Sequence, residues 1–321
     1  MSTPIVAPEP LIDFIRRYDG FVMLGHLEPD GDCVGSELAL SSALRRMGKT
    51  VQVLNPGPFD RQEIAGFESH FDIAYDADAL PDNHAVIVVD CSSEDRIERF
   101  ATHIRHLEMA VIDHHRAGEP FGDVRFVRPD IPATTIIITY LIEQLGLRLT
   151  ADEATWLFLG LVTDTGFFRF LDTDQAVAFE AASRLTRAGA SPRTIDRIIN
   201  GGRSYESRLL ISRVLDRMER LGDGSIILTH QTRRDEMELG TRRDSDALYR
   251  LLLAIEGVRV IAVAKEKENG CTVSFRSADD TDVSGLAAQI GGGGHQRASG
   301  AFTSLPLAQF LPSLRKQLLT L

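Results

Sequence analysis

Acidic and histidine side chains gather in four short segments of this chain, each directly after an apolar run. The segments are His26-Leu-Glu-Pro-Asp30-Gly-Asp32, Asp90, Asp113-His114-His115 and Asp164. Carboxylate oxygens and imidazole nitrogens suit Mn²⁺ or Mg²⁺, and they do not exclude Zn²⁺, Co²⁺ or Fe²⁺. Two such ions roughly 3.5 to 4 Å apart can clamp a phosphoryl group and generate hydroxide from water at neutral pH. The pattern predicts phosphoester hydrolysis without a covalent intermediate.

Each segment alone also has a purely structural interpretation. The first could be a solvated acidic turn with a helix-capping aspartate. Asp90 could be the polar end of a strand, and the histidine pair a surface turn. Asp164 could be a polar residue that ends a helix, although an acidic residue is unfavourable at the negative end of a helix and invites a compensating cation. Together the segments supply enough ligands for two cations if one carboxylate bridges: His26, Asp30, Asp32, Asp90, His114 and Asp164.

Apolar runs that precede these residues predict a parallel sheet. Strands are expected at 21–25, 51–54, 85–89 and 109–112, and helices at 36–47, 134–145 and 152–163. Nearly continuous apolar strands separated by helix-length stretches are typical of a parallel sheet with both faces covered. Ligands of such sheets bind beyond the carboxyl ends of the strands. All four acidic and histidine segments fall there.

The length of 321 residues predicts two domains, with a site between them. Residues 176–217 are helical in character, and strands are expected at 225–229, 258–265 and 271–276. The fold class is therefore α/β. We expect a larger N-terminal domain with a parallel sheet over 1–186, a helical linker over 187–204, and a smaller α/β domain over 205–321.

Charge and composition limit the partners. The net charge of −11 argues against a broad basic face for long duplex nucleic acid, whereas short nucleotides remain compatible. Three widely spaced cysteines indicate buried free thiols rather than disulfides or a zinc site. The first ten residues lack a leader pattern and no apolar run is long enough to cross a membrane, so we expect a cytoplasmic protein with no membrane partner. A homodimer is expected only because dimers are common.

A glycine-rich run, Gly291 to Gly294, precedes His295 and Arg297 near the C-terminus. Such a run is compatible with a flexible linker. Apolar residues 283–290 before it and Ala-Ser-Gly-Ala-Phe302 after it favour instead a loop whose backbone N–H groups approach an anion. His295 and Arg297 would then add charged contacts.

Five motifs together resemble the DHH phosphoesterase family, in the subgroup with a C-terminal DHHA1 domain. They occur in the family's order and cover nearly the whole chain: His26-Leu-Glu-Pro-Asp30-Gly-Asp32, Val88-Val-Asp90, Ile112-Asp113-His114-His115, Thr163-Asp164-Thr-Gly166 and Gly291-Gly-Gly-Gly-His295-Gln-Arg-Ala-Ser-Gly300. The resemblance implies two divalent cations per chain, with Mn²⁺ favoured over Mg²⁺ or Co²⁺.

The resemblance also implies a role for each matched residue. His26, Asp30 and Asp90 would hold one cation, and Asp32, Asp90, His114 and Asp164 the other. Asp113 would orient its neighbours, and His115 would face the scissile phosphate or leaving oxygen. Substrate contacts would come from Gly293, Gly294, His295, Arg297, Arg276 in Ser274-Phe-Arg-Ser277, and Arg169 in Gly166-Phe-Phe-Arg-Phe170.

Chain length is most similar to the compact family members that degrade very short RNA and dephosphorylate 3′-phosphoadenosine 5′-phosphate. Short RNA oligonucleotides and nucleotide bisphosphates are thus the expected substrates. Three alternatives stay open: a phosphodiesterase for linear or cyclic dinucleotides such as pApA or pGpG, a RecJ-like single-strand exonuclease, and a nucleotide sensor with little turnover. A sensor would need neither a bridging Asp90 nor His115.

Overall fold

The computed structural model describes residues 4–116, 118–240 and 244–321. The chain divides into two compact units, Met1–Gly201 and Gly202–Leu321. Each has its own sheet and its own apolar core.

The first unit is built on a five-stranded parallel sheet of order β2-β1-β3-β4-β5. The four strands expected from the sequence are confirmed. β5 was not predicted, because its short run is only partly buried. The bounds are β1 Gly20–Leu24, β2 Thr50–Leu54, β3 His84–Val89, β4 Met109–Asp113 and β5 Val124–Val127.

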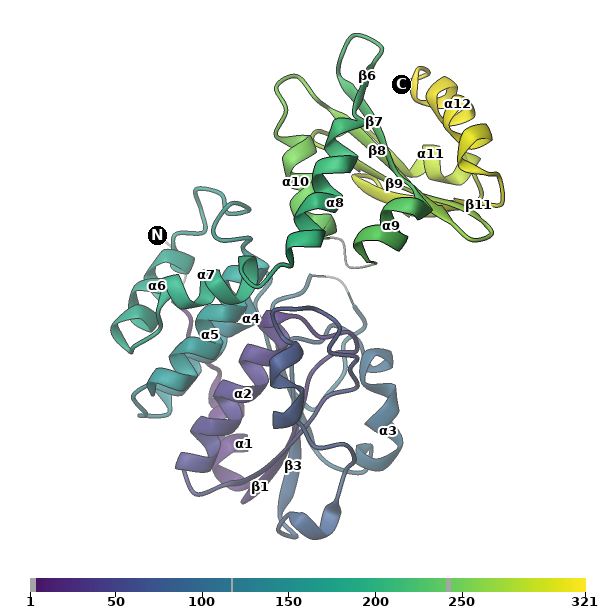
Figure 1. Cartoon of the computed structure of the whole chain (residues 1–321). Coiled ribbons are helices and arrows are strands. Elements are labelled where there is room, and N and C mark those ends of the chain that lie inside the picture. The colour runs from purple at the N-terminus through teal and green to yellow at the C-terminus, as the bar shows by residue number, and fades with distance from the viewer. Residues whose placement is uncertain (1–3, 117, 241–243) are drawn as a thin grey trace. The chain divides into compact units, whose positions relative to one another are not determined.

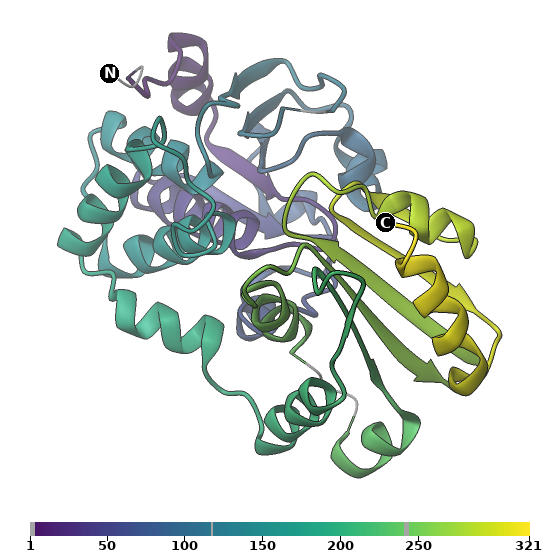
Figure 2. The same ribbon diagram turned by 90° about the horizontal axis from the view of Figure 1, so that it is seen from above.

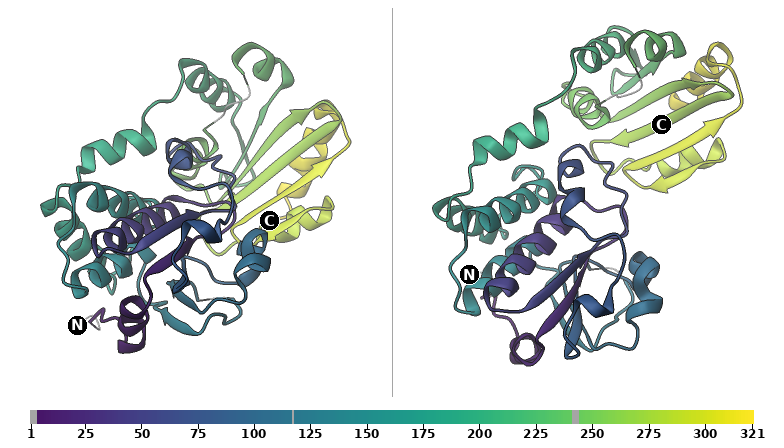
Figure 3. Two further views of the ribbon diagram at one scale, coloured as in Figure 1. Left: turned by 90° about the horizontal axis from the view of Figure 1, so that it is seen from below. Right: turned by 60° about the horizontal axis from the view of Figure 1, so that its bottom comes forward.

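Helices cover both faces of this sheet, which explains why its strands are apolar throughout (Figure 1). Along β1, Phe21 and Met23 pack on the face that carries most of the helices. Val22 and Leu24 face the opposite way and belong to a second apolar cluster with Phe100 and Ile104 of α3 (Glu98–Ile104). α3 is labelled in Figure 1, and Figure 3 shows the same unit from two further sides. The other face carries α1 (Glu9–Arg17), α2 (Gly31–Arg46), α4 (Thr134–Gln144) and α5 (Ala151–Asp164).

Close packing of α2, α4 and α5 requires a small residue at the contact. A Cβ atom on Gly160 of α5 would lie 2.4 Å from the Thr135 side chain and 2.8 Å from the Asp32 Cα atom. α5 begins with a capping box in which Thr150 and Glu153 bond each other's backbone N–H groups. The glycine therefore lets α5 approach the start of α2, where the acidic segment lies.

The remaining elements of the first unit are short. Two helices, α6 (Val177–Arg187) and α7 (Pro192–Asn200), pack on the main core through residues such as Leu185 and Ile195. Three 3₁₀ turns lie in the connections after β2 and β3, at Ala65–His70, Ala77–Ala79 and Glu94–Ile97.

The second unit has a six-stranded sheet of order β10-β11-β9-β8-β7-β6, in which only β7 and β8 are parallel. The three strands expected here are confirmed. The bounds are β6 Glu219–Leu221, β7 Ile226–Gln231, β8 Val260–Lys267, β9 Gly270–Ser277, β10 Gly293–His295 and β11 Ala298–Thr303.

Helices lie on both faces of the second sheet as well. α11 (Ser284–Gln289) and α12 (Leu307–Leu318) pack on one face, and α12 is the yellow helix in Figure 2. α8 (Tyr205–Asp216) and α10 (Ser245–Leu253) pack on the other face, against β7 and β8. α9 (Arg233–Leu239) follows β7. Among the described residues, no helix combines the length and apolar character needed to cross a membrane.

The glycine-rich run differs from the expected loop. Gly293 to His295 form β10, which pairs antiparallel with β11, so that Gly293 lies opposite Gly300 and His295 opposite Ala298. Gly292 has no room for a side chain, because a Cβ there would lie 2.2 Å from the Gly300 carbonyl oxygen. The glycines therefore permit a tight hairpin at the edge of the sheet, and part of their backbone is used in strand pairing.

Candidate active site

The four acidic and histidine segments of the first unit meet at the carboxyl edge of the parallel sheet. His26 follows β1 and Asp90 follows β3, and these two strands are neighbours although β2 lies between them in the chain. Asp90 adopts a left-handed backbone conformation with φ of 53°, which is rare for a residue other than glycine. Such local strain is common where a side chain must be aimed at a functional site.

One group of side chains is formed by His26, Asp30 and Asp90. The Nε2 atom of His26 lies 3.6 Å from Asp90 Oδ2 and 4.0 Å from Asp30 Oδ1. Asp30 is also the N-cap of α2, because its Oδ1 accepts from the backbone N–H groups of Asp32 and Cys33. The capping interpretation and the clustering of Asp30 with His26 are thus compatible.

A second group is formed around His114. Its Nε2 atom lies 3.2 Å from Asp164 Oδ2, 3.6 Å from Asp90 Oδ1 and 4.0 Å from Asp32 Oδ2. Asp32 and Asp90 are almost fully buried. Asp90 therefore presents one carboxylate oxygen to each group, which is the arrangement that a bridging ligand needs.

The histidine rings are oriented by backbone carbonyls. The Nδ1 atom of His26 lies 2.8 Å from the carbonyl oxygen of Leu27, and that of His114 lies 3.2 Å from the carbonyl oxygen of Ile131. The Nδ1 atom of His26 also lies 2.9 Å from Nη2 of Arg96, which is a donor. For His114, an Nδ1–H that donates to Ile131 leaves Nε2 facing the carboxylates, where it could bind a cation. This is the usual way in which a protein fixes the tautomer of a metal-binding histidine.

Two threonines at the start of α4 complete the surroundings of the carboxylates. Asp32 accepts from the backbone N–H groups of Thr134 and Thr135 at 2.6 and 2.9 Å, and from Thr135 Oγ1 at 2.6 Å. Thr134 Oγ1 donates to Asp90 Oδ1 at 2.9 Å. Sequence reasoning missed both residues, because a Thr-Thr pair opening an apolar helix gives no signal of its distant partners.

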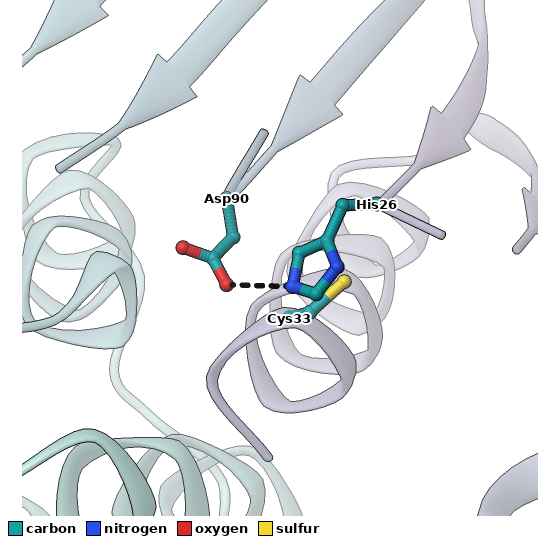
Figure 4. A group of neighbouring side chains, drawn as sticks. All are labelled: His26, Cys33 and Asp90. Carbon is teal, nitrogen blue, oxygen red and sulfur yellow. Dashed lines mark ion pairs between the residues drawn. The ribbon is translucent and has the colours of Figure 1, made fainter. Parts of the chain in front are cut away.

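Cys33 is a further residue that the sequence did not place at the site. Its buried side chain lies with His26 and Asp90 in a group close enough to share a metal ion (Figure 4). Burial, with the nearby charges of Glu37 and Asp90, raises the pKa of the Cys33 thiol well above its usual value. The thiol lies 3.5 Å from Glu37 Oε2 and can donate to it.

Glu37 and Asn55 form a buried hydrogen-bonded chain behind His26. Asn55 Nδ2 donates to Glu37 Oε2 at 3.0 Å, while Asn55 Oδ1 accepts from the backbone N–H of Gly57 at 2.9 Å. The Gly57 carbonyl in turn accepts from the backbone N–H of Glu28 at 2.8 Å. Burial raises the pKa of Glu37 to about 8. The chain connects α2 to the loop that carries His26 and Asp30.

His115 is hydrogen-bonded to Asp113, and its Nδ1 atom also lies 3.8 Å from Oδ1 of Asp90. Its Nδ1 atom lies 2.7 Å from Asp113 Oδ1, which also accepts from the backbone N–H of His114. The hydrogen bond to Asp113 is the main cause that raises the pKa of His115. The ring is partly exposed, so its Nε2 atom is free to act as a proton donor toward a ligand.

The crowded carboxylates repel one another. Burial raises the pKa of Asp32 well above its usual value, and the charges of Asp90 and Asp164 add to the effect. Burial also raises the pKa of Asp164. Burial alone would lower the pKa of His114, but its hydrogen bond to Asp164 and the charges of Asp32 and Asp90 outweigh burial and raise it to about 10. Bound cations would relieve this repulsion, so the residues fit a divalent metal centre.

The predicted substrate contacts are only partly brought together. Arg169 lies on the turn after α5, where its Nε donates to the Gly166 carbonyl. The others belong to the second unit. Arg276 and His295 share one sheet face, because Ala298 of β11 is paired with both, and Gly293 lies on the same face. Gly294 lies on the opposite face of the sheet, and the Arg297 guanidinium donates a hydrogen bond to Asp280.

Comparison with known proteins agrees with this geometry. The N-terminal domain of the DHH family matches residues 21–161, and the DHHA1 domain matches residues 238–319. The chain therefore belongs to the DHH family of phosphoesterases, with a DHHA1 domain, and is a hydrolytic enzyme. The resemblance drawn from the motifs is confirmed.

Two relatives and one solved structure are similar over most of their length. The chain is 29% identical to the "bifunctional oligoribonuclease and PAP phosphatase NrnA" of Thermus thermophilus, over 92% of this chain and 90% of the relative. It is 26% identical to the Bacillus subtilis protein of the same name, over 91% of each. An exopolyphosphatase-related protein from Bacteroides fragilis has the same fold, with a TM-score of 0.79, 24% identity and coverage of 99% of this chain and 100% of that one.

Proposed function

We propose that this enzyme hydrolyses very short oligoribonucleotides to mononucleotides and removes a phosphate from 3′-phosphoadenosine 5′-phosphate. The observation that carries the proposal is the position of Asp90, which turns one carboxylate oxygen toward His26 and the other toward His114. The names of the two relatives, which match nearly the full chain, support this choice of substrates.

Two divalent cations would be held by the two groups. His26, Asp30 and Asp90 would bind the first. The second would be bound by Asp32, Asp90, His114 and Asp164, with Thr134 and Thr135 orienting the carboxylates. Oxygen and imidazole donors favour Mn²⁺, with Mg²⁺ or Co²⁺ as alternatives. Such cations would lower the pKa of bound water and stabilise negative charge on the phosphoryl oxygens.

His115 would give a proton to the leaving oxygen. Its hydrogen bond to Asp113 keeps the imidazolium form populated at higher pH than usual, and places that proton donor beside the carboxylate cluster. The ring lies next to that of His114, with centroids 4.6 Å apart. Asp113 orients the ring and balances its charge, as a buried carboxylate does for a histidine general acid.

The second unit would bind the remainder of the substrate. Arg276, His295 and Gly293 lie on a face of the sheet where the side chains of β9 are only partly buried. The covering helices α8 and α10 contact β7 and β8 on this face. A cationic surface with small neighbours suits a phosphate or a base. We propose Arg276, Gly293, Gly294, His295, Arg297 and Arg169 as substrate-binding residues.

A substrate series tests the proposal. Release of mononucleotides would be measured from 5′-labelled RNAs of two to about twenty-four residues, beside 3′-phosphoadenosine 5′-phosphate, with Mn²⁺ and with chelator. We expect Mn²⁺-dependent turnover concentrated on the shortest RNAs and the bisphosphate. Efficient digestion of the longest RNAs would indicate a processive exonuclease, and turnover of dinucleotides alone would indicate a dinucleotide phosphodiesterase.

A further inference from the structure

A hollow of about 380 Å³ adjoins the metal-binding groups within the first unit. The residues that line it include His114, His115, Arg116, Ile131, Asp164 and Phe170. Its volume lies in the range of small-molecule sites, which is roughly 300 to 1,000 Å³. It shares His114, His115 and Asp164 with the candidate active site, so a ligand in it would lie beside the proposed metal-binding residues.

Phe170 is the most exposed large apolar residue of this hollow, with 70% of its surface accessible. Its ring packs against Gly166, since a Cβ atom on that glycine would lie 2.4 Å from Phe170 Cε2. A single exposed apolar side chain is common on protein surfaces and needs no explanation by itself. The backbone that holds Phe170 is less common.

Three consecutive residues before Arg169 adopt the left-handed conformation: Gly166, Phe167 and Phe168 have φ angles of 55°, 56° and 66°. This conformation is unfavourable for residues other than glycine. It is held by the Phe167 backbone N–H, which donates to the Val162 carbonyl, and by Phe168, which stacks on Phe179 with ring centroids 4.9 Å apart. The turn therefore fixes Phe170 six residues after the metal-binding Asp164.

Positive charge lies beside the exposed ring. The Arg169 guanidinium lies 5.4 Å from the Phe170 ring centroid, and Arg116 lines the same hollow. An aromatic surface next to arginines, a few residues from a phosphoryl site, complements a nucleotide, which has a flat base and an anionic phosphate. An inorganic phosphate or a polyphosphate would make no use of the ring.

We propose that this hollow binds the nucleobase of the nucleotide at the scissile phosphate, with Phe170 as its stacking surface. The proposal rests on the proposed function and adds to it a residue that selects nucleotides over other phosphoesters. Stacking tolerates every base, so Phe170 would confer affinity for nucleotides without a strong sequence preference.

The test is a double-mutant-type cycle that removes the Phe170 ring from the enzyme and the base from the substrate, separately and together. Wild type, Phe170→Ala, Phe170→Leu and Phe170→Trp would be assayed on a diribonucleotide and on the same compound lacking the base at the scissile phosphate. We expect Phe170→Ala and Phe170→Leu to raise KM for the intact dinucleotide about ten-fold or more, with KM for the abasic compound unchanged. Phe170→Trp should retain the wild-type KM.

Mn²⁺ affinity would be measured for each variant, because a Phe170 side chain that only supported Asp164 would change it when replaced. We expect Mn²⁺ affinity to stay unchanged. Tyr205→Ala, which removes another exposed aromatic ring, is the matched control. An equal effect of Phe170→Ala on both compounds, or none on either, would overturn the proposal.

Binding of AMP and of ribose 5-phosphate, compared by equilibrium dialysis, tests the same preference for the base without turnover. A preference for AMP that Phe170→Ala abolishes would support the proposal even if the wild type hydrolysed no RNA, whereas equal binding would refute it.

Discussion

Asn55 donates a hydrogen bond of 3.0 Å to Glu37 in the interior of the first unit, and neither residue touches solvent to any large extent. Asn55 follows β2 and Glu37 lies on α2, so the bond links two elements that flank the His26 loop. Through Gly57 the same asparagine reaches the backbone of Glu28. This chain of hydrogen bonds therefore supports the loop that carries His26 and Asp30.

Breaking this link should weaken the metal centre. Asn55→Ala is expected to lower Mn²⁺ affinity about 10- to 100-fold, the usual effect of losing a residue that positions ligands. Glu37→Gln keeps the shape of the side chain and should have a smaller effect in the same direction. Calorimetric Mn²⁺ titration measures both, with Asn83→Ala on the surface as the control. Unchanged Mn²⁺ affinity in Asn55→Ala would show that the loop holds itself in place.

The pair of Asp113 and His115 makes a prediction about pH. The hydrogen bond to Asp113 raises the pKa of His115, so the acid form persists to higher pH. Asp113→Asn should lower that pKa. If His115 donates a proton, the alkaline limb of kcat/KM should move to lower pH in Asp113→Asn, because the acid form is then lost earlier. His115→Asn should lower kcat and remove this limb. An alkaline limb at the same pH in all three proteins would exclude His115 as the acid.

The hairpin of the second unit should affect substrate rather than metal. His295→Ala and Arg297→Ala are expected to raise KM for dinucleotides with little change in Mn²⁺ affinity, since both residues belong to the unit that contains no metal-binding group among its described residues. Asp280→Asn releases Arg297 from its ion pair and leaves its charge in place, so it should not raise KM. Equal loss of metal and substrate binding would contradict this assignment.

Stability of the second unit should depend on pH through the ion pair of Arg217 with Asp235, whose carboxylate is buried. Burial alone would raise the pKa of Asp235, but hydrogen bonds from Arg217 and Thr232 outweigh it and hold the pKa below its usual value. A lowered carboxylate pKa stabilises the fold above the unfolded pKa of about 4, and this stability is lost as pH falls below it. Asp235→Asn should cost about 2 kcal/mol at pH 7 and less at pH 3.

Thermal unfolding followed by circular dichroism at the two pH values measures the difference for Asp235→Asn. Asp216→Asn, an exposed aspartate on α8, is the matched control. A destabilisation of Asp235→Asn that is as large at pH 3 as at pH 7 would mean that the charge of Asp235 contributes nothing.

The sequence predicted the strands of the parallel sheet and the segments that meet at its edge, because apolar runs followed by Asp or His are local signals. It could not predict Thr134, Thr135, Glu37 or Asn55, whose partners lie far away in the chain or on other elements. The glycine-rich run was expected to be a loop, yet its last residues, Gly293 to His295, pair as β10. Strand pairing depends on β11 and β9, and a run of glycines has no side-chain pattern that reveals a partner.

Asp90 is the most direct test of the central claim, which is hydrolysis through two cations that share one carboxylate. Mn²⁺ stoichiometry and dinucleotide turnover would be measured on the same samples of wild type and Asp90→Ala, with circular dichroism to confirm the fold. We predict two Mn²⁺ per wild-type chain, fewer than two in Asp90→Ala, and a loss of turnover of several orders of magnitude. Two tightly bound Mn²⁺ and near-normal turnover in Asp90→Ala would contradict the bridging role and the two-cation mechanism with it.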